Sequence, residues 1–261
     1  MANSPHGYDT KSWNPVTGCS RISAGCRSCW AEEYSRRMGW PWEVTLHPER
    51  LDAPLHWRKP QVVATAYMGD LWHEGVPDEF IDKVFATMAL TQWHAYLLLT
   101  KRPARLLAYL MGLAVDIANW PLPTEKGFPR IRAATLCRLV DWPLPNVWLS
   151  VSVENQATAD ERIPLLLETP AAHRWVSFEP LLGEILLDAS IKELDWAVIG
   201  GESGPKARPM NLAWMTQLVA FCDTFKVPCY VKQDSHRYPS RQGRIPTALW
   251  ERKAVPWEPT L

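Results

Sequence analysis

The sequence predicts an α/β fold built on a parallel sheet or barrel, and three observations lead to that prediction. Short apolar runs rich in β-branched residues recur along the chain, and each ends in small or polar residues. Stretches with helical periodicity follow most of these runs, and this alternation is typical of βαβ units. The length of 261 residues suits a single α/β barrel, which commonly fills about 250 residues.

Six runs are expected to be strands. They are nearly continuous in apolar residues, as a parallel sheet covered on both faces requires. In chain order they span residues 62–68, 94–100, 147–153, 173–178, 196–199 and 227–232.

Helices are expected between these strands. Asp78 and Glu79 begin a stretch of helical spacing that continues to Leu90, and acidic residues are favourable near a helix N-terminus. Three further stretches with helical spacing span residues 103–113, 158–167 and 211–225.

The chain is expected to form one domain over residues 1–261 with two additions. Residues 116–146 contain two Trp-Pro-Leu-Pro strings and break the strand–helix alternation, which predicts an insertion. Residues 234–261 are rich in Arg, Pro and Trp without a clear period, which predicts an irregular C-terminal extension.

Composition restricts the possible partners and compartment. Lys plus Arg and Asp plus Glu both number 28, so the total charge does not indicate a polyanionic partner, although a neutral total can contain a local basic cleft. The N-terminal residues lack the charged-then-apolar order of a signal peptide, and no apolar run reaches the ~18–20 residues that span a bilayer. We therefore expect a soluble protein of the cytoplasm with no membrane partner.

The 15 tryptophans have two readings. They are either large packing residues that anchor irregular loops, or in part the lining of a cleft where a base could stack, which is a known use of aromatic side chains. Composition alone leaves both open.

Three cysteines form the most informative motif. Cys19, Cys26 and Cys29 have the spacing C-x6-C-x2-C within a loop that also holds two glycines. Clustered cysteines in a cytosolic chain more often bind metal or catalyse than form disulfides. An iron–sulfur cluster held by three thiolates would leave one iron open for a ligand.

The alternative is a closed zinc site, which needs a fourth protein ligand. No fourth Cys or His lies inside the motif, so an open cluster is the leading hypothesis. The nearest candidates for a fourth ligand are His6, His47, Cys137, Cys222 and Cys229.

Polar residues stand at the predicted C-terminal ends of the strands, where an α/β barrel places its working residues. They are Asp70, Lys101, Arg102, Ser152, Glu154, Glu179, Glu202 and Lys232. One such residue is usually a solvated loop residue, but a ring of them that begins at the cysteine loop predicts a shared site.

The segment Gly200-Gly-Glu-Ser-Gly204 is neither a Walker loop nor a G-x-G-x-x-G fingerprint. We expect a tight turn after a strand, in which the glycines let a ligand approach the backbone and Glu202 points into the mouth of the barrel.

Several of these motifs together resemble a family of phage and prophage proteins with radical-SAM-like sequences, over roughly residues 8–233. The motifs are the cysteine loop, Gly69-Asp70-Leu71-Trp72, Leu99-Thr-Lys-Arg-Pro103, Val151-Ser-Val-Glu-Asn155, Ser177-Phe-Glu-Pro-Leu-Leu-Gly183, Gly200-Gly-Glu-Ser-Gly204 and Val231-Lys-Gln233. The resemblance implies a partial TIM-like (β/α)6 barrel with the cluster loop after its first strand. It also implies a [4Fe-4S] cluster on Cys19, Cys26 and Cys29, with S-adenosylmethionine (SAM) on the open iron.

Two features depart from the wider radical SAM superfamily. Its usual spacing is C-x3-C-x2-C with an aromatic residue before the third cysteine, whereas Ser28 stands here and Trp30 follows Cys29. Its usual Gly-Gly-Glu after the second strand is replaced by Met68-Gly-Asp70.

The resemblance further implies an enzyme of the isomerase or lyase type that generates a 5′-deoxyadenosyl radical. The expected substrate is a modified thymidine or other nucleobase in phage DNA, and the expected electron donor is a protein such as a flavodoxin. Asp70, Ser152 and Glu154 are expected to contact SAM. Lys101, Arg102, Glu179, Glu202 and Lys232 are expected to act on the substrate.

Two alternatives remain open at this point. One is a radical SAM enzyme that repairs DNA photoproducts. The other is a non-catalytic iron–sulfur or zinc protein that serves as a binding module.

Overall fold

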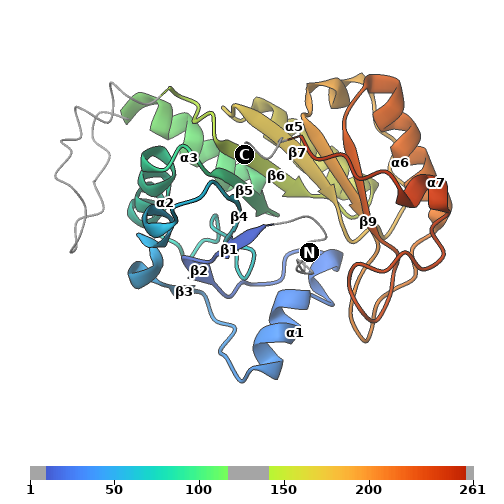
Figure 1. The fold of residues 1–261 in the computed structure, drawn as a ribbon, viewed down its shortest axis with the longest axis horizontal. Helices are drawn as coiled ribbons and strands as arrows, with labels where there is room; N and C mark the ends of the chain where they lie inside the picture. The colour runs from blue at the N-terminus through green and yellow to red at the C-terminus, as the bar shows by residue number, and fades with distance from the viewer. Residues whose placement is uncertain (1–9, 117–140, 257–261) are drawn as a thin grey trace.

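A computed structural model describes residues 10–116 and 141–256 (Figure 1). Within these ranges, seven parallel strands form one sheet in the order β1-β4-β5-β6-β7-β8-β9, and the sheet curls into a half-barrel. The strands are β1 (Lys11–Trp13), β4 (Val62–Thr65), β5 (Ala95–Thr100), β6 (Val147–Ser152), β7 (His173–Phe178), β8 (Trp196–Gly200) and β9 (Cys229–Gln233).

The predicted α/β class with a curved parallel sheet is confirmed, and each of the six apolar runs contains a strand. The described residues also contain a seventh strand, β1, which pairs in parallel with β4 and precedes the cysteine loop. Its residues Lys11 and Ser12 are exposed and only Trp13 is buried, so no apolar run marks this strand in the sequence.

The helices predicted from periodicity also form. The described residues contain α1 (Trp30–Arg37), α2 (Asp78–Leu90), α3 (Pro103–Asp116), α5 (Gln156–Glu168), α6 (Leu212–Phe225) and α7 (Thr247–Trp250). The Asn155 side chain caps α5 by accepting from the Thr158 backbone N–H, and such a cap satisfies an amide that would otherwise lack an intrahelical partner.

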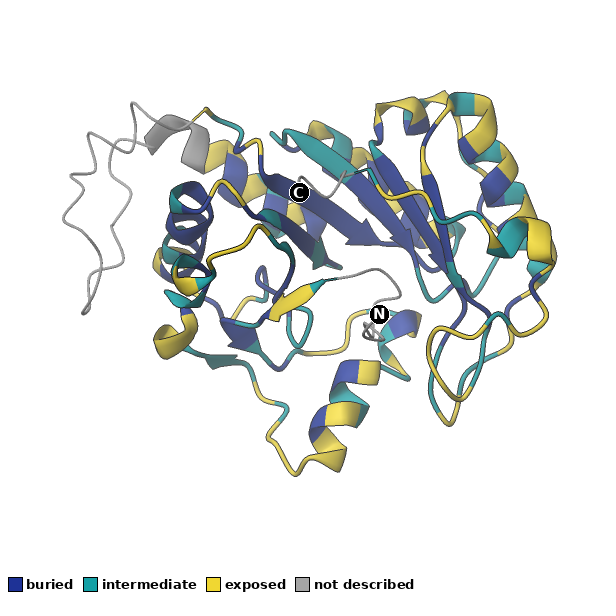
Figure 2. Ribbon diagram, viewed as in Figure 1, coloured by how far each residue is buried: buried dark blue, intermediate teal, exposed yellow. Residues whose placement is uncertain are grey.

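The convex face of the sheet carries the main core. Leu98, Val151 and Val176 belong to one buried cluster with side chains of the helices, such as Val84 on α2 and Leu218 on α6. Figure 1 shows α2, α3, α5 and α6 on this outer side of the curled sheet, and Figure 2 shows that most of the strand residues are buried.

The concave face carries a second, smaller cluster. Leu97, Trp148, Trp175, Trp196 and Tyr230 pack together near the N-terminal ends of their strands. Since side chains alternate between the faces of a strand, the same face continues toward the C-terminal ends with small polar residues. Those are Ser150 and Ser152 on β6 and Ser177 on β7, all buried.

Two short strands and the C-terminal segment complete the description. β2 (Val16–Thr17) and β3 (Thr45–Leu46) form an antiparallel pair beside the cysteine loop. Most of the predicted insertion, residues 117–140, lies outside the described residues. The predicted C-terminal extension is loop apart from α7 as far as residue 256, and Lys253 bridges back to Tyr230. Across residues 10–116 and 141–256, no helix combines the length and apolar character that a membrane crossing requires.

Candidate functional site

All predicted site residues lie at one edge of the sheet. Since the sheet is parallel, the C-terminal ends of its strands meet at the same edge. Asp70 follows β4, Lys101 and Arg102 follow β5, Ser152 ends β6, Glu154 and Glu179 follow β6 and β7, Glu202 follows β8, and Lys232 lies near the end of β9.

The cysteine loop is attached to this edge. Gly18, just before Cys19, forms a parallel bridge with Gly69 after β4. Cys26 ends a short 3-10 helix, η1 (Ala24–Cys26), and Cys29 is the N-cap of α1. The three cysteines are free thiols, each partly buried.

Two consecutive cations from β5 reach two of the cysteines. The Lys101 ammonium lies 3.8 Å from the Cys26 sulfur, and the Arg102 guanidinium lies 3.4 Å from the Cys19 sulfur. Arg102 also donates to the side-chain and backbone oxygens of Ser20. The sulfurs of Cys19 and Cys26 are therefore held beside neighbouring positive charges.

These surroundings act differently on the three thiols. Burial, with a further contribution from Asp70, raises the pKa of Cys19 to about 11. Burial also raises the pKa of Cys29. At Cys26 burial acts in the same direction, but Lys101 and hydrogen bonds from the loop outweigh it and lower the pKa of that thiol.

Glu154 is the most unusual ionisable residue of the site. Its side chain is fully buried. Its Oε1 accepts from Ser23 Oγ at 2.7 Å and lies 2.9 Å from Lys101 Nζ and 3.4 Å from Arg162 Nη1. Its Oε2 has no hydrogen-bond partner among the described residues, although buried polar atoms almost always have one.

Neighbouring cations keep the Glu154 carboxylate ionised. Burial favours the neutral acid, but Lys101 and Arg162 outweigh it and hold the pKa of Glu154 below its usual value. A buried carboxylate with one unpartnered oxygen is suited to accept from a bound donor.

Gly25 explains how the loop comes so close to Glu154. A Cβ at Gly25 would overlap the Glu154 carboxylate, so only glycine permits this approach. The neighbouring Ser23 can then donate to Glu154, and the cysteine loop is fixed to the end of β6.

Asp70 has a different role from the one expected. Its two carboxylate oxygens accept from Thr100 Oγ1 at 2.8 and 2.9 Å and from the backbone of Trp72, and one of them pairs with Arg102 at 3.2 Å. These partners occupy the carboxylate within the protein. Asp70 therefore orients Arg102, and this geometry does not support the predicted contact with SAM.

Glu202 also differs from the expectation that it points into an open mouth. Both of its oxygens accept from Arg208, at 2.5 and 2.9 Å, and Arg208 donates to the Ala24 carbonyl in the cysteine loop at 3.0 Å. Nor does Gly201 leave room for a ligand, because a Cβ there would overlap the Ser235 backbone. Glu202 therefore holds the loop through Arg208.

Glu179 and Lys232 form a separate pair. The Lys232 ammonium lies 2.8 Å from Glu179 Oε2, and both side chains are largely buried. The pair joins the ends of β7 and β9, on either side of β8 in the sheet. Within the described residues, no hydrogen bond connects this pair to the cysteine loop.

Four residues that hold the loop were not predicted from the sequence. They are Ser20, Ser23, Arg162 and Arg208. Ser20 and Ser23 lie inside the cysteine motif, so their position was a usable signal. Arg162 and Arg208 carry no local signal, because only the packing of α5 and of the loop after β8 brings them to this edge.

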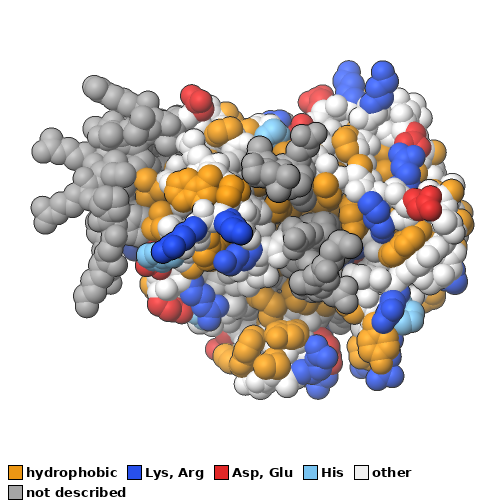
Figure 3. Space-filling model, viewed as in Figure 1, with side chains coloured by type: hydrophobic (Ala, Val, Ile, Leu, Met, Phe, Trp, Pro, Cys, Tyr) orange, Lys and Arg blue, Asp and Glu red, His pale blue; other side chains and the backbone are white. Residues whose placement is uncertain are grey.

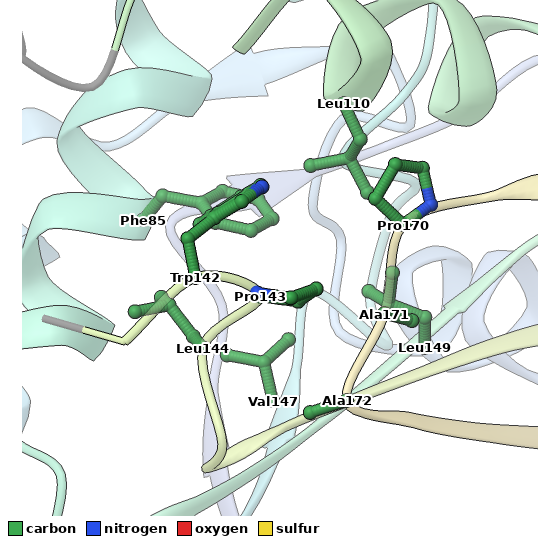
Figure 4. Close-up of a pocket in the computed structure, with 10 residues that line it drawn as sticks. All are labelled: Phe85, Leu110, Trp142, Pro143, Leu144, Val147, Leu149, Pro170, Ala171 and Ala172. Atoms are coloured by element: carbon green, nitrogen blue, oxygen red, sulfur yellow. The ribbon is translucent and has the colours of Figure 1, made fainter. Parts of the chain in front are cut away.

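Two cavities differ sharply in size. An open hollow of about 470 Å³ lies against Arg21, Ile22, Ser23, Ala24 and Arg27 of the cysteine loop. The apolar crevice in Figure 4 lies between α2, α3 and the start of β6 and measures about 10 Å³. That volume holds roughly one water molecule, so the hollow at the cysteine loop is the better candidate for a ligand site.

The thiols do not form a preformed metal cage. Across residues 10–116 and 141–256, no three side chains of His, Cys, Asp or Glu already converge as metal ligands. Metal binding and local ordering are commonly coupled, so binding of a metal would draw the three thiols together.

The comparisons with known proteins give one match. Residues 3–252 match the model of a family whose description is "Protein of unknown function (DUF5131)". Neither the curated proteins nor the solved structures contain a match to this chain.

Proposed function

This chain belongs to the DUF5131 family, and we propose from its own residues that it is a radical SAM enzyme that acts on a nucleobase in DNA. Cys19, Cys26 and Cys29 would hold a [4Fe-4S] cluster. One observation above all supports this: the three-cysteine loop is docked beside Glu154, whose Oε2 is buried without a partner among the described residues.

The donor set fits an open iron–sulfur cluster better than closed zinc. A closed zinc site needs four protein ligands, and the cysteine loop supplies three. His47, one candidate for the fourth ligand, is hydrogen-bonded to Thr17 and Glu49. Three thiolates on a four-iron cluster carry net negative charge, which Lys101 and Arg102 are placed to offset.

The protein's own side chains would bind SAM and the substrate and orient them. Glu154 Oε2 is the acceptor best suited to the amino group of SAM, because it is charged, buried and unpartnered. Ser23, Gly25 and Arg208 would keep the loop closed on the edge of the sheet. Glu179 and Lys232, which pair with each other at the ends of β7 and β9, would contact the substrate.

When bound, the cluster and SAM would supply one-electron cleavage of the bond between the sulfonium and the 5′ carbon, giving methionine and a 5′-deoxyadenosyl radical that abstracts a hydrogen atom. The electron would come from a reduced protein such as a flavodoxin. The half-barrel would position SAM and the substrate and would exclude water from the site.

The DNA substrate rests on the resemblance described above, and a modified thymidine is the favoured target. A photoproduct-type repair reaction would use the same site. A non-catalytic metal-binding module is the rival from a different class.

The test is metal and SAM analysis of protein purified without oxygen. We expect about four iron and four sulfide per chain after reconstitution, and slow release of 5′-deoxyadenosine from SAM after reduction with dithionite. Cys26→Ala should lose the iron, whereas Cys222→Ala, on α6 away from the loop, should keep it. Stoichiometric zinc without iron, or a full cluster that neither binds nor cleaves SAM even with DNA present, would overturn the proposal.

A further inference from the structure

Exposed aromatic and apolar side chains are concentrated beside the cysteine loop. Half of the large hydrophobic side chains that are exposed among the described residues fall within residues 22–40, and these are Ile22, Trp30, Tyr34, Met38 and Trp40. Scattered exposed apolar residues need no explanation, but a contiguous group marks a binding surface.

The spacing places three of these side chains on one side of α1. Trp30, Tyr34 and Met38 recur every four residues, which puts them on one helix face. The Tyr34 and Trp40 rings meet edge to face at 5.8 Å. The Arg37 guanidinium lies 5.6 Å from the Tyr34 ring.

A matching group lies in the loop after β9. Tyr238 is 55% exposed, and the Arg237 guanidinium lies 5.8 Å from its ring. Figure 3 shows hydrophobic side chains next to Lys and Arg over α1, and again over the loop that follows β9. An exposed tyrosine beside an arginine therefore occurs in both places.

Hydrogen bonds join the two groups into one rim. Arg208, after β8, donates to Ala24 in the cysteine loop. The His236 N–H donates to Glu202 O at 3.1 Å, and the Gly204 N–H donates to His236 O at 3.0 Å. The rim, here meaning residues 21–40, 204–208 and 236–241, includes the residues that line the hollow of about 470 Å³, all of which belong to the cysteine loop.

The rim has an excess of positive charge although the chain is neutral overall. Its neighbouring carboxylates are already neutralised: Glu32 pairs with Arg21, Glu33 with Arg36, Glu202 with Arg208 and Asp234 with Arg244. Five further cations of the rim form no ion pair within the described residues, namely Arg27, Arg37, Lys206, Arg237 and Arg241.

We propose that this rim binds single-stranded nucleic acid, with bases stacked on Tyr34, Trp40 and Tyr238 and phosphates beside the unpaired cations. Aromatic platforms within a positively charged groove are the usual means of binding a single strand without sequence preference. The five unpaired cations among these aromatics favour a polyanionic partner, because Lys and Arg side chains neutralise the phosphates of a bound strand.

The inference deepens the proposed function and rests on it for one step only, the delivery of a base to the cluster site. Enzymes that act on a base use single strands or extrude the base from the duplex. A polymer rather than a free nucleoside would then be the substrate. Binding of the strand itself requires no cluster.

The test is fluorescence anisotropy of a labelled 20-nucleotide oligothymidine with the full-length protein. We expect Tyr34→Ala, Trp40→Ala and Tyr238→Ala each to weaken binding by about 5- to 100-fold, as loss of one stacking platform does. Arg37→Gln and Arg237→Gln should each reduce the slope of log K against log salt by about 0.7. Far-UV circular dichroism should show that these exposed substitutions leave the fold intact.

The matched control is Trp93→Ala. Trp93 is 49% exposed but precedes β5, at the opposite edge of the sheet, so its loss should leave binding unchanged. Rim variants that bind like wild type, or an equal loss in Trp93→Ala, would overturn the inference. So would light scattering that shows a dimer abolished by Tyr34→Ala, because the rim would then be a contact between copies of the chain.

The two proposals fail separately. Cys26→Ala protein should bind the oligonucleotide as wild type does. Strand binding by a protein that takes up no iron would defeat only the proposed function. SAM cleavage by a protein whose rim binds no strand would defeat only this inference.

Discussion

Lys101 lies 2.9 Å from the buried Oε1 of Glu154, and its ammonium also reaches the Cys26 sulfur at 3.8 Å. One side chain thus joins the ends of two neighbouring strands to the cysteine loop. The attraction between its charge and that of Glu154 keeps the carboxylate ionised although it is removed from water. Both the shape of the loop and the charge of the site depend on this contact.

Glu154→Gln should weaken SAM binding by about ten- to hundred-fold while the iron content stays unchanged. The substitution nearly preserves shape but removes a charged acceptor, whose hydrogen bond contributes ~1.5–3 kcal/mol. Equilibrium dialysis with labelled SAM measures the effect. Glu184→Gln, at an exposed glutamate after β7, serves as control, and an unchanged Kd in Glu154→Gln protein with a full cluster would remove Glu154 from the SAM site.

Arg102→Gln should shift the midpoint reduction potential of the cluster to more negative values. Arg102 is 6% exposed and donates toward the Cys19 sulfur, and such donors favour the reduced, more negative cluster. If Arg102 stabilises the reduced cluster by about 1.4 kcal/mol more than the oxidised one, its loss shifts the potential by ~59 mV for one electron. A redox titration followed by electron paramagnetic resonance gives the value, with Arg58→Gln at an exposed arginine as control. Equal potentials in both variants would assign Arg102 a purely structural role.

Arg208→Gln should loosen the cysteine loop without unfolding the sheet. The guanidinium is the link between Glu202 and the Ala24 carbonyl, and glutamine is too short to replace both contacts. Amide hydrogen exchange should rise in residues 19–29 and remain unchanged in β5 and β6. Arg252→Gln breaks an ion pair with Asp223 on α6 instead, so faster exchange of the loop in that variant would argue against the specific link.

Asp234→Asn should lower the free energy of unfolding at pH 7 more than at pH 3. Burial favours the neutral acid, but hydrogen bonds from Arg244 outweigh it and lower the pKa of Asp234 in the folded protein. A carboxyl with a depressed folded pKa stabilises the fold above its unfolded pKa of about 3.9, and that contribution disappears as pH falls through the folded value.

The expected difference at pH 7 is about 1 kcal/mol, because the Arg244 side chain is half exposed and solvent screens the pair. Urea titrations of both proteins at the two pH values measure it. A difference that stays the same at pH 3 would mean that the charge of Asp234 does not contribute.

Much of the scaffold was predictable because it depends on local pattern. Nearly continuous apolar runs such as residues 147–152 correctly predicted buried strands, and the acidic start at Asp78 marked α2 correctly. The cysteine motif and the residues at strand ends followed from topology, since parallel strands bring their C-terminal ends to one edge. No apolar run marked the residues of β1, because two of its three residues are exposed and polar.

The partners of each site residue were decided only by the tertiary structure. Asp70 and Glu202 looked like free carboxylates in the sequence, yet Arg102 and Arg208 occupy them. Glu154 had the same appearance and retains an unpartnered oxygen. The difference arises from long-range packing, which determines how many donors reach each carboxylate. Local sequence sets which strand end carries a charge, but the distances between strand ends, and hence the electrostatics of the site, exist only once the sheet has curled.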